Sequence, residues 1–187
     1  EPSREVHVIE EVPADEAARQ VVAYLKERGV LDPSARAPRE LALAPFESRP
    51  TVGPGVWVVA EMSAAGVHYV THELLAAAQP VAEAVGGHVA ALVFGGPGIS
   101  GAVAGLAHHG ADVVLVAEDE QLAGYATDAY AATLVGAIQR ERPYAVLLAS
   151  TPNGRDLAAR VAGRLQLGLT GDAIGLEVDH EGRLVQL

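Results

Sequence analysis

Short apolar runs and alanine-rich stretches alternate along the chain from residue 56 onward. Each run is rich in valine or other apolar residues, as expected of a strand that helices cover on both faces. Between the runs, apolar residues recur at helical spacing. This alternation predicts an α/β fold, a Rossmann-like three-layer α/β/α sandwich around a mostly parallel sheet. The predicted strands span residues 56–61, 89–94, 113–117 and 144–149, and the predicted helices span 71–85, 99–109, 125–142 and 156–167.

Residues at the boundaries of these segments have the types that begin and end helices. Thr71 and Asn153 lie where a side chain that caps a helix N-terminus is expected. Gly86 and Gly110 follow helical stretches and predict where they end. After the last helix, residues 174–187 contain two short apolar runs joined by Asp-His-Glu-Gly, which predicts a C-terminal hairpin at the end of the sheet.

The first fifty residues do not share this alternation. Residues 6–11 predict a strand, and residues 15–28 predict an amphipathic helix that ends at Gly29. Prolines at positions 33, 38, 45, 50 and 54 predict an extended linker. We therefore expect three parts: an N-terminal strand–helix arm at residues 1–31, a proline-rich linker at 32–54 and the α/β domain at 55–187.

Charge and composition exclude several classes of partner. The chain has 13 basic and 24 acidic residues, and its formal net charge of −11 repels nucleic-acid backbones and anionic lipid surfaces. It has no cysteine, and therefore no disulfide, thiolate metal site or thiol chemistry. No apolar run is long enough to span a bilayer, so we expect no membrane insertion and a cytoplasmic location. Because the sequence begins at Glu1 rather than methionine, we interpret it as a piece of a longer chain.

A glycine-rich sequence, Gly96-Pro97-Gly98-Ile99-Ser100-Gly101, lies between a predicted strand and a predicted helix. In a dinucleotide-binding domain, Gly98 would let a pyrophosphate approach the helix N-terminus, and Glu118 after the next strand would bind a ribose hydroxyl. The alternative is a tight turn without a ligand, which Pro97 favours because it removes one backbone N–H from the cradle. A dinucleotide site at Gly96, Gly98, Gly101 and Glu118 stays open as the second interpretation.

The run from Thr151 to Leu165 follows the last predicted strand, at the sheet edge where open α/β proteins place their sites. Arg155 lies at the start of a helix, where a cation gains nothing from the helix dipole. A carboxylate on this chain or on a partner would explain it. Alternatively, Asp156 caps the helix and Arg155 is a solvated surface charge. If Arg155 is paired and desolvated, its replacement by alanine should weaken folding or partner association by roughly 2 to 5 kcal/mol.

No residue pattern indicates catalysis or metal binding. The seven histidines include no pair at metal-ligand spacing with a supporting carboxylate. His68 and His72 are four residues apart, but His68 precedes the predicted helix, so the two should not share a face. Ser150 has no nucleophile-elbow sequence around it. We expect neither a catalytic residue nor a metal ligand.

The run from Thr151 to Leu165, continued by Gly168-Leu169-Thr170-Gly171-Asp172, resembles the signature T…GRDLAPRVAARL…GLT(A/G)D of the electron-transfer flavoprotein α subunit. Ala159 stands where that family has proline and Gly163 where it has alanine, two mild departures. Two upstream segments also fall where the family has similar features: Val56-Trp57-Val58-Val59-Ala60-Glu61, and Gly110-Ala111-Asp112 followed by Tyr125 and Tyr130. Residues 55–187 are thus similar to the first domain of that subunit.

The resemblance implies a component of an electron carrier rather than an enzyme. In that family the second domain of the α subunit holds most of the FAD, so the FAD-binding residues are expected beyond residue 187. Gly98-Ile99-Ser100-Gly101-Ala102 spells part of a flavin-domain segment. We interpret this match as coincidence, because its companion segments are missing.

The partners implied by the resemblance are a β subunit or fused β domain, which would hold AMP, and an FAD domain. The full protein would carry electrons from dehydrogenases to a quinone-linked or ferredoxin-type acceptor. This domain would then be a scaffold and interaction domain, and the interface residues implied are Asn153, Arg155, Asp156 and Arg160.

The N-terminal arm carries a second resemblance. Residues 6–10 and 22–31 resemble the C-terminal tail of the family's β subunit, which implies a fragment of a β–α fusion. Amphipathic helices rich in lysine and glutamate are common, so an unrelated N-terminal helix is the alternative.

Overall fold

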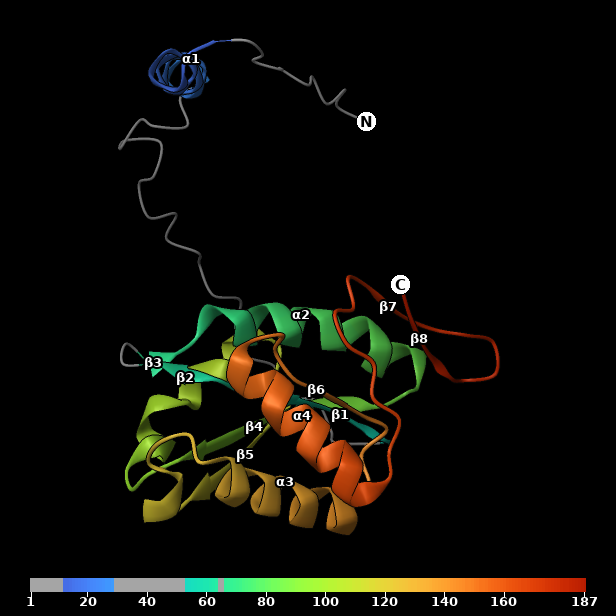
Figure 1. The fold of residues 1–187 in the computed structure, drawn as a ribbon. Coiled ribbons are helices and arrows are strands. Elements are labelled where there is room, and N and C mark those ends of the chain that lie inside the picture. Colours follow the sequence, from blue (N-terminus) through green and yellow to red (C-terminus); the bar gives the residue numbers. More distant parts are fainter. Residues whose placement is uncertain (1–11, 29–52, 64–65) are drawn as a thin grey trace. The chain divides into compact units, whose positions relative to one another are not determined.

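A computed structural model describes residues 12–28, 53–63 and 66–187 (Figure 1). The chain divides into two units, Glu1–Ala42 and Leu43–Leu187. The first contains α1 (Ala14–Glu27), in agreement with the predicted helix. Arg19 donates to Asp15 and Glu16 one turn earlier, at 2.9 and 3.0 Å, a spacing that stabilises a helix locally. The predicted strand at residues 6–11 and the predicted linker, except its last two residues, lie outside the described residues.

The second unit is built on a four-stranded parallel sheet, which confirms the predicted fold class. The order in the sheet is β5-β4-β1-β6, so β1 and β4 are the inner strands. Val56 of β1 is paired with Val89 on one side and Ala145 on the other. All four predicted strands are present, with ends shifted by one or two residues: β1 (Gly55–Val59), β4 (His88–Gly95), β5 (Val113–Glu118) and β6 (Ala145–Leu147).

Helices cover both faces of the sheet (Figure 1). On one face, α2 (Tyr69–Ala84) packs on Val56 and Val58 of β1. On the other face, α3 (Thr127–Glu141) and α4 (Pro152–Leu165) pack on Trp57 and Val59. Successive residues of β1 therefore point into opposite cores and are all buried, which is why the strand is apolar throughout.

The segment predicted as a helix at residues 99–109 is not an α-helix. It forms two short 3₁₀-helices, η2 (Ile99–Ala102) and η3 (Ala104–His109). Its apolar residues do serve the core, since Val103 and Leu106 are buried. Gly101 and Gly105 lie within the segment, and glycine is a poor α-helix former, so the apolar spacing alone did not determine the helix type.

Both predicted N-caps are wrong. The cap of α2 is His68, whose Nδ1 accepts from the backbone N–H of Val70 at 3.3 Å. Thr71 is instead fully buried in the first turn. The cap of α4 is Thr151, whose hydroxyl accepts from the N–H of Gly154 at 3.0 Å. Pro152 occupies the first helical position, where its missing N–H costs nothing, so the helix starts before Asn153. The predicted stops are confirmed: Gly86 and Gly110 follow helices and have positive φ angles of 63° and 101°.

Two small hairpins complete the unit. The predicted C-terminal hairpin is present as β7 (Leu176–Val178) paired with β8 (Leu184–Gln186). It does not join the main sheet but forms a two-stranded sheet of its own. Leu176 and Val178 of β7 pack against the same core as α2, and β7 contacts α2. A second pair, β2 (Met62–Ser63) and β3 (Gly66–Val67), follows β1 and was not predicted, since two-residue strands carry no periodic signal.

Candidate functional site

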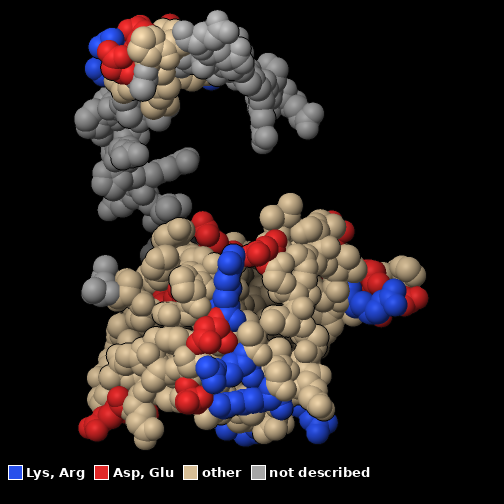
Figure 2. All heavy atoms as spheres, viewed as in Figure 1, with Lys and Arg blue, Asp and Glu red and all other residues tan. Residues whose placement is uncertain are grey.

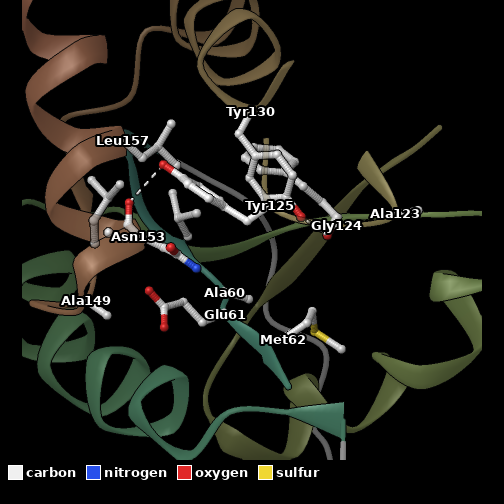
Figure 3. Close-up of a pocket in the computed structure, with 14 residues that line it drawn as sticks. Ala60, Glu61, Met62, Ala123, Gly124, Tyr125, Tyr130, Ala149, Asn153 and Leu157 are labelled. Atoms are coloured by element: carbon white, nitrogen blue, oxygen red, sulfur yellow. Dashed lines mark hydrogen bonds between the residues drawn. The ribbon is translucent and has the colours of Figure 1, made fainter. Parts of the chain in front are cut away.

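The order of the strands creates a switch point beside β1. From β1 the chain moves to β4 and then β5 on one side, and afterwards crosses to β6 on the other side. Ligands of open α/β sheets bind where the strand order reverses, outside the carboxyl ends of the strands. A pocket of about 140 Å³ lies at this place (Figure 3). It is lined by Val59 at the end of β1, by Ala60, Glu61 and Met62 after β1, by Leu148 and Ala149 after β6 and by the first turns of α4.

Aromatic rings form one wall of this switch-point pocket. Tyr130 meets Phe94 edge to face, with ring centroids 5.4 Å apart, and Tyr125 lies 5.1 Å from Tyr130. The hydroxyl of Tyr130 lies 3.2 Å from the carbonyl oxygen of Leu122. The hydroxyl of Tyr125 donates to Asp156 at 2.9 Å and lies 3.1 Å from the carbonyl oxygen of Asn153. Burial raises the pKa of both tyrosines, so they remain neutral phenols at physiological pH.

Glu61 carries the only formal charge among the residues that line the pocket. Its backbone N–H donates to the hydroxyl of Thr71 at 3.0 Å, and Thr71 is fully buried in α2. Its carboxylate accepts from the hydroxyl of Thr151, the residue that caps α4. Two helices thus fix the position of Glu61 at the end of β1. No local sequence pattern marks Glu61, because Thr71 and Thr151 are 10 and 90 residues away from it.

Gly154 allows α4 to begin directly against the end of β6. A Cβ atom at this position would lie 2.0 Å from the carbonyl oxygen of Ala149, far inside van der Waals contact. Gly154 is buried and adjoins the pocket. The glycine in the Asn153-Gly154-Arg155-Asp156 segment is therefore required for close packing of helix on strand.

Arg155 pairs with a carboxylate of this chain. Its guanidinium lies 2.6 Å from Asp172 and donates to the hydroxyl of Ser150 at 3.0 Å. Ser150 donates to the same carboxylate at 2.7 Å. The Ser150 hydroxyl first, and then the Arg155 cation, lower the pKa of Asp172. The side chains of Arg155 and Asp172 are 63% and 71% exposed, so the pair is not desolvated and the condition for a large effect on folding is not met.

The other predicted interface residues lie along the same helix. Asp156 accepts from Thr127 at 2.6 Å as well as from Tyr125, and these bonds lower its pKa. Arg160 lies 3.6 Å from Asp128, and Arg164 donates to the same carboxylate at 3.1 Å. These contacts connect α4 with α3 at the surface. We call the exposed side of α4 that carries Asn153, Arg155, Asp156, Arg160 and Arg164 the α4 surface.

The glycine-rich sequence is a turn that the protein's own carboxylate fills. Glu118 accepts from the N–H of Gly98 at 2.7 Å and from the hydroxyl of Ser100 at 2.6 Å. Ser100 first, then Gly98, lower the pKa of Glu118, which keeps it anionic. Gly98 has a φ of 92°, and a Cβ at Gly96 would lie 2.8 Å from that of Ala123. Gly101 has open space around its Cβ position. The residues of the dinucleotide interpretation are thus brought together, but Glu118 occupies the place of the anion.

Two further properties concern the described part of the chain. It contains no group of three or more potential ligands that could hold a metal ion. None of its helices is both long enough and apolar enough to cross a membrane. His72 stacks on His109 with ring centroids 3.8 Å apart, while His68 caps α2.

Comparison with known proteins places the domain in a family. A family model described as the electron transfer flavoprotein domain matches residues 56–187, and the chain belongs to this family. The chain is 44% identical over 124 residues to the electron transfer flavoprotein subunit alpha of Syntrophomonas wolfei, a match that covers 66% of this chain and 38% of that relative.

Two further relatives are similar over nearly the same share of the chain. Protein FixB of Clostridium saccharobutylicum is 39% identical over 127 residues, 68% of this chain and 37% of the relative. The electron transfer flavoprotein subunit alpha of Bacillus subtilis is 35% identical over 130 residues, 68% of this chain and 38% of the relative. The chain thus spans less than two fifths of the length of these relatives. The resemblance of residues 55–187 to the first domain of the α subunit is confirmed.

Proposed function

We propose that residues 55–187 are a scaffold and subunit-interaction domain of an electron-transfer flavoprotein, and that they do not hold the flavin. The proposal that the domain does not hold the flavin rests on Glu118, whose carboxylate bonds the Gly98 N–H and the Ser100 hydroxyl where a pyrophosphate would need donors. A phosphate there would have to displace a fixed anion. The switch-point pocket, at about 140 Å³, is also smaller than the roughly 300 Å³ at which pockets for larger ligands begin.

The partners that we propose are those expected of an electron-transfer flavoprotein α subunit. A β subunit or fused β domain, itself holding AMP, would bind this domain, and a separate domain of the complete protein would hold FAD. Electrons would pass from dehydrogenases through that FAD to a quinone-linked or ferredoxin-type acceptor. Residues 1–31 would be the tail of a β-type domain, and the protein would be cytoplasmic. This domain would contribute no catalytic group.

The α4 surface is the part of the domain that we propose contacts the partner. Basic and acidic side chains gather along α4 (Figure 2), where Arg155, Arg160 and Arg164 each lie within 4 Å of a carboxylate. Such mixed charge orients a partner and sets specificity more than it stabilises the fold. Asn153 begins this surface and also lines the pocket, so the two features are continuous.

Titration with nucleotides tests the absence of a cofactor site. We expect no saturable binding of FAD, NAD or AMP to the 187-residue chain at micromolar concentrations, measured by calorimetry. Gly98→Val is the matched variant, because it disturbs the turn and should leave this result unchanged. Tight NAD binding that Gly98→Val abolishes would contradict the proposal and support the dinucleotide interpretation.

Charge removal on the α4 surface tests the interaction role. The double variant Arg155→Ala/Arg160→Ala should change the melting temperature by less than about 3 °C, because the two side chains are 63% and 47% exposed and their ion pairs are solvated. It should weaken association with a β-type subunit by about 30-fold or more, because the pairs lose water when the partner covers them. Surface plasmon resonance measures the affinity. Arg140→Ala is the control, an exposed arginine paired with its neighbour Glu141. Equal affinity of both variants and the parent chain would show that α4 is not the interface.

A further inference from the structure

The switch-point pocket combines apolar walls with an unfilled hydrogen-bonding capacity. Among the described residues, one carboxylate oxygen of Glu61 accepts from Thr151 and the other has no partner. The side-chain amide of Asn153 is likewise without a partner in this part of the chain. Figure 3 shows both side chains directed toward the same part of the pocket, below the ring of Tyr125. The free oxygen of Glu61 therefore offers an acceptor, and the amide of Asn153 offers one acceptor oxygen and one donor NH2 group.

The size of the pocket limits what can enter it. Its volume of about 140 Å³ resembles that of an engineered cavity of about 150 Å³ that holds one benzene molecule. A single ring or one long side chain fills such a space. A flavin or a complete nucleotide is larger than this volume.

The polar groups at the pocket do not suit a phosphate. The N-terminus of α4 could favour an anion, but its Gly154 N–H is already bonded to Thr151, and Pro152 has no N–H to give. Glu61 adds a negative charge beside these groups, and no lining residue is basic. A cationic donor is favoured, and an anion is repelled.

We propose that the switch-point pocket receives one arginine side chain of the partner polypeptide. The methylene stem of arginine would lie along the apolar wall, and its planar guanidinium would bond Glu61 and stack near Tyr125. A polypeptide source is favoured over a free small molecule because the pocket opens beside the α4 surface, with Asn153 common to both. This inference rests on the proposed function, in which that surface contacts a partner.

A model compound tests the pocket without the partner. N-acetyl-argininamide should shift the backbone amide resonances of Ala60, Asn153 and Gly154 in a saturable way. N-acetyl-citrullinamide has nearly the same shape without the charge, and should bind at least about tenfold more weakly. Glu61→Gln should weaken argininamide binding by a similar factor. Glu177→Gln, which removes an equal charge from the exposed position in β7, should leave the affinity unchanged.

Any of the following results would contradict the proposed arginine contact. Equal binding of argininamide and citrullinamide would show that charge recognition is absent. Equal weakening by Glu61→Gln and Glu177→Gln would reduce the effect to general attraction by an acidic protein. Saturable shifts with adenosine or AMP that exceed those with argininamide would make the pocket a nucleoside site, and no shift with any probe would show that it is closed. If argininamide fails while the double variant on α4 still weakens association with a β-type subunit, the proposed function stands and only the arginine contact is lost.

Discussion

Replacing Gly154 by alanine is expected to lower the free energy of unfolding by about 3 kcal/mol. The added methyl group would lie 2.0 Å from the carbonyl oxygen of Ala149 and 3.0 Å from its carbonyl carbon. Both are backbone atoms just after β6, so no side-chain rotation relieves the clash. The start of α4 must move away from the sheet, and the contact between Thr151 and Glu61 moves with it.

Denaturant unfolding followed by tryptophan fluorescence measures this loss. Trp57 is the only tryptophan and is 3% exposed between the sheet and the helices, so its emission reports on the α/β domain. Gly163→Ala is the matched control, because it lies in the same helix and its Cβ position is open. That change should stabilise the domain by about 0.5 to 1 kcal/mol. Equal stability of the two variants would refute the packing role assigned to Gly154.

Replacing Leu75 by alanine is expected to cost about 3 kcal/mol, within the usual range of about 2 to 5 for a buried leucine. Leu75 is fully buried in α2, in the core that also contains Val56 and Val58 of β1. The surrounding strands are fixed by two neighbours each, so they cannot collapse into the space that the side chain leaves.

The control for this variant is a leucine outside the core. Leu169 is 55% exposed, and Leu169→Ala should change the free energy of unfolding by less than about 0.5 kcal/mol. The same fluorescence assay compares both variants. A loss below about 1 kcal/mol for Leu75→Ala would show that α2 is only loosely attached to the sheet.

The strands and the layer order could be predicted because their signals are local. A strand covered on both faces must be apolar at every position, as β1 is, and glycines with positive φ mark the helix ends at Gly86 and Gly110. The segment 99–109 could not be predicted from its apolar spacing, since 3₁₀-helices and an α-helix place apolar residues on the core in similar ways. The cap of α2 was assigned wrongly because the hydroxyl of Thr71 accepts from the backbone N–H of Glu61, just after β1, rather than from an N–H of its own helix.

The candidate site was predicted only in part. A cation at the start of α4 indicated an anionic partner, and Asp172 is that partner. The identity of the partner and its exposure depend on where the chain returns after α4, which no local pattern encodes. In the glycine-rich sequence, by contrast, the local pattern was clear and the distant partner was not. Its spacing matches a nucleotide motif, yet Glu118, 20 residues after Gly98, folds back to fill it.

The pairing of β6 with β1 has a consequence for the order in which the domain folds. Val56 in β1 and Ala145 in β6 are about 90 residues apart in sequence, whereas Val56 pairs with Val89, 33 residues later, and Ala90 pairs with Val113, 23 residues later. Contacts that close long loops form late, so we expect β6 and α4 to dock last. The pocket, Glu61 in its bonded position and the α4 surface are all completed by that step. A partner that binds there would therefore bind only fully folded domains and not partly folded chains. Assembly of the complex would then depend on completed folding of this domain.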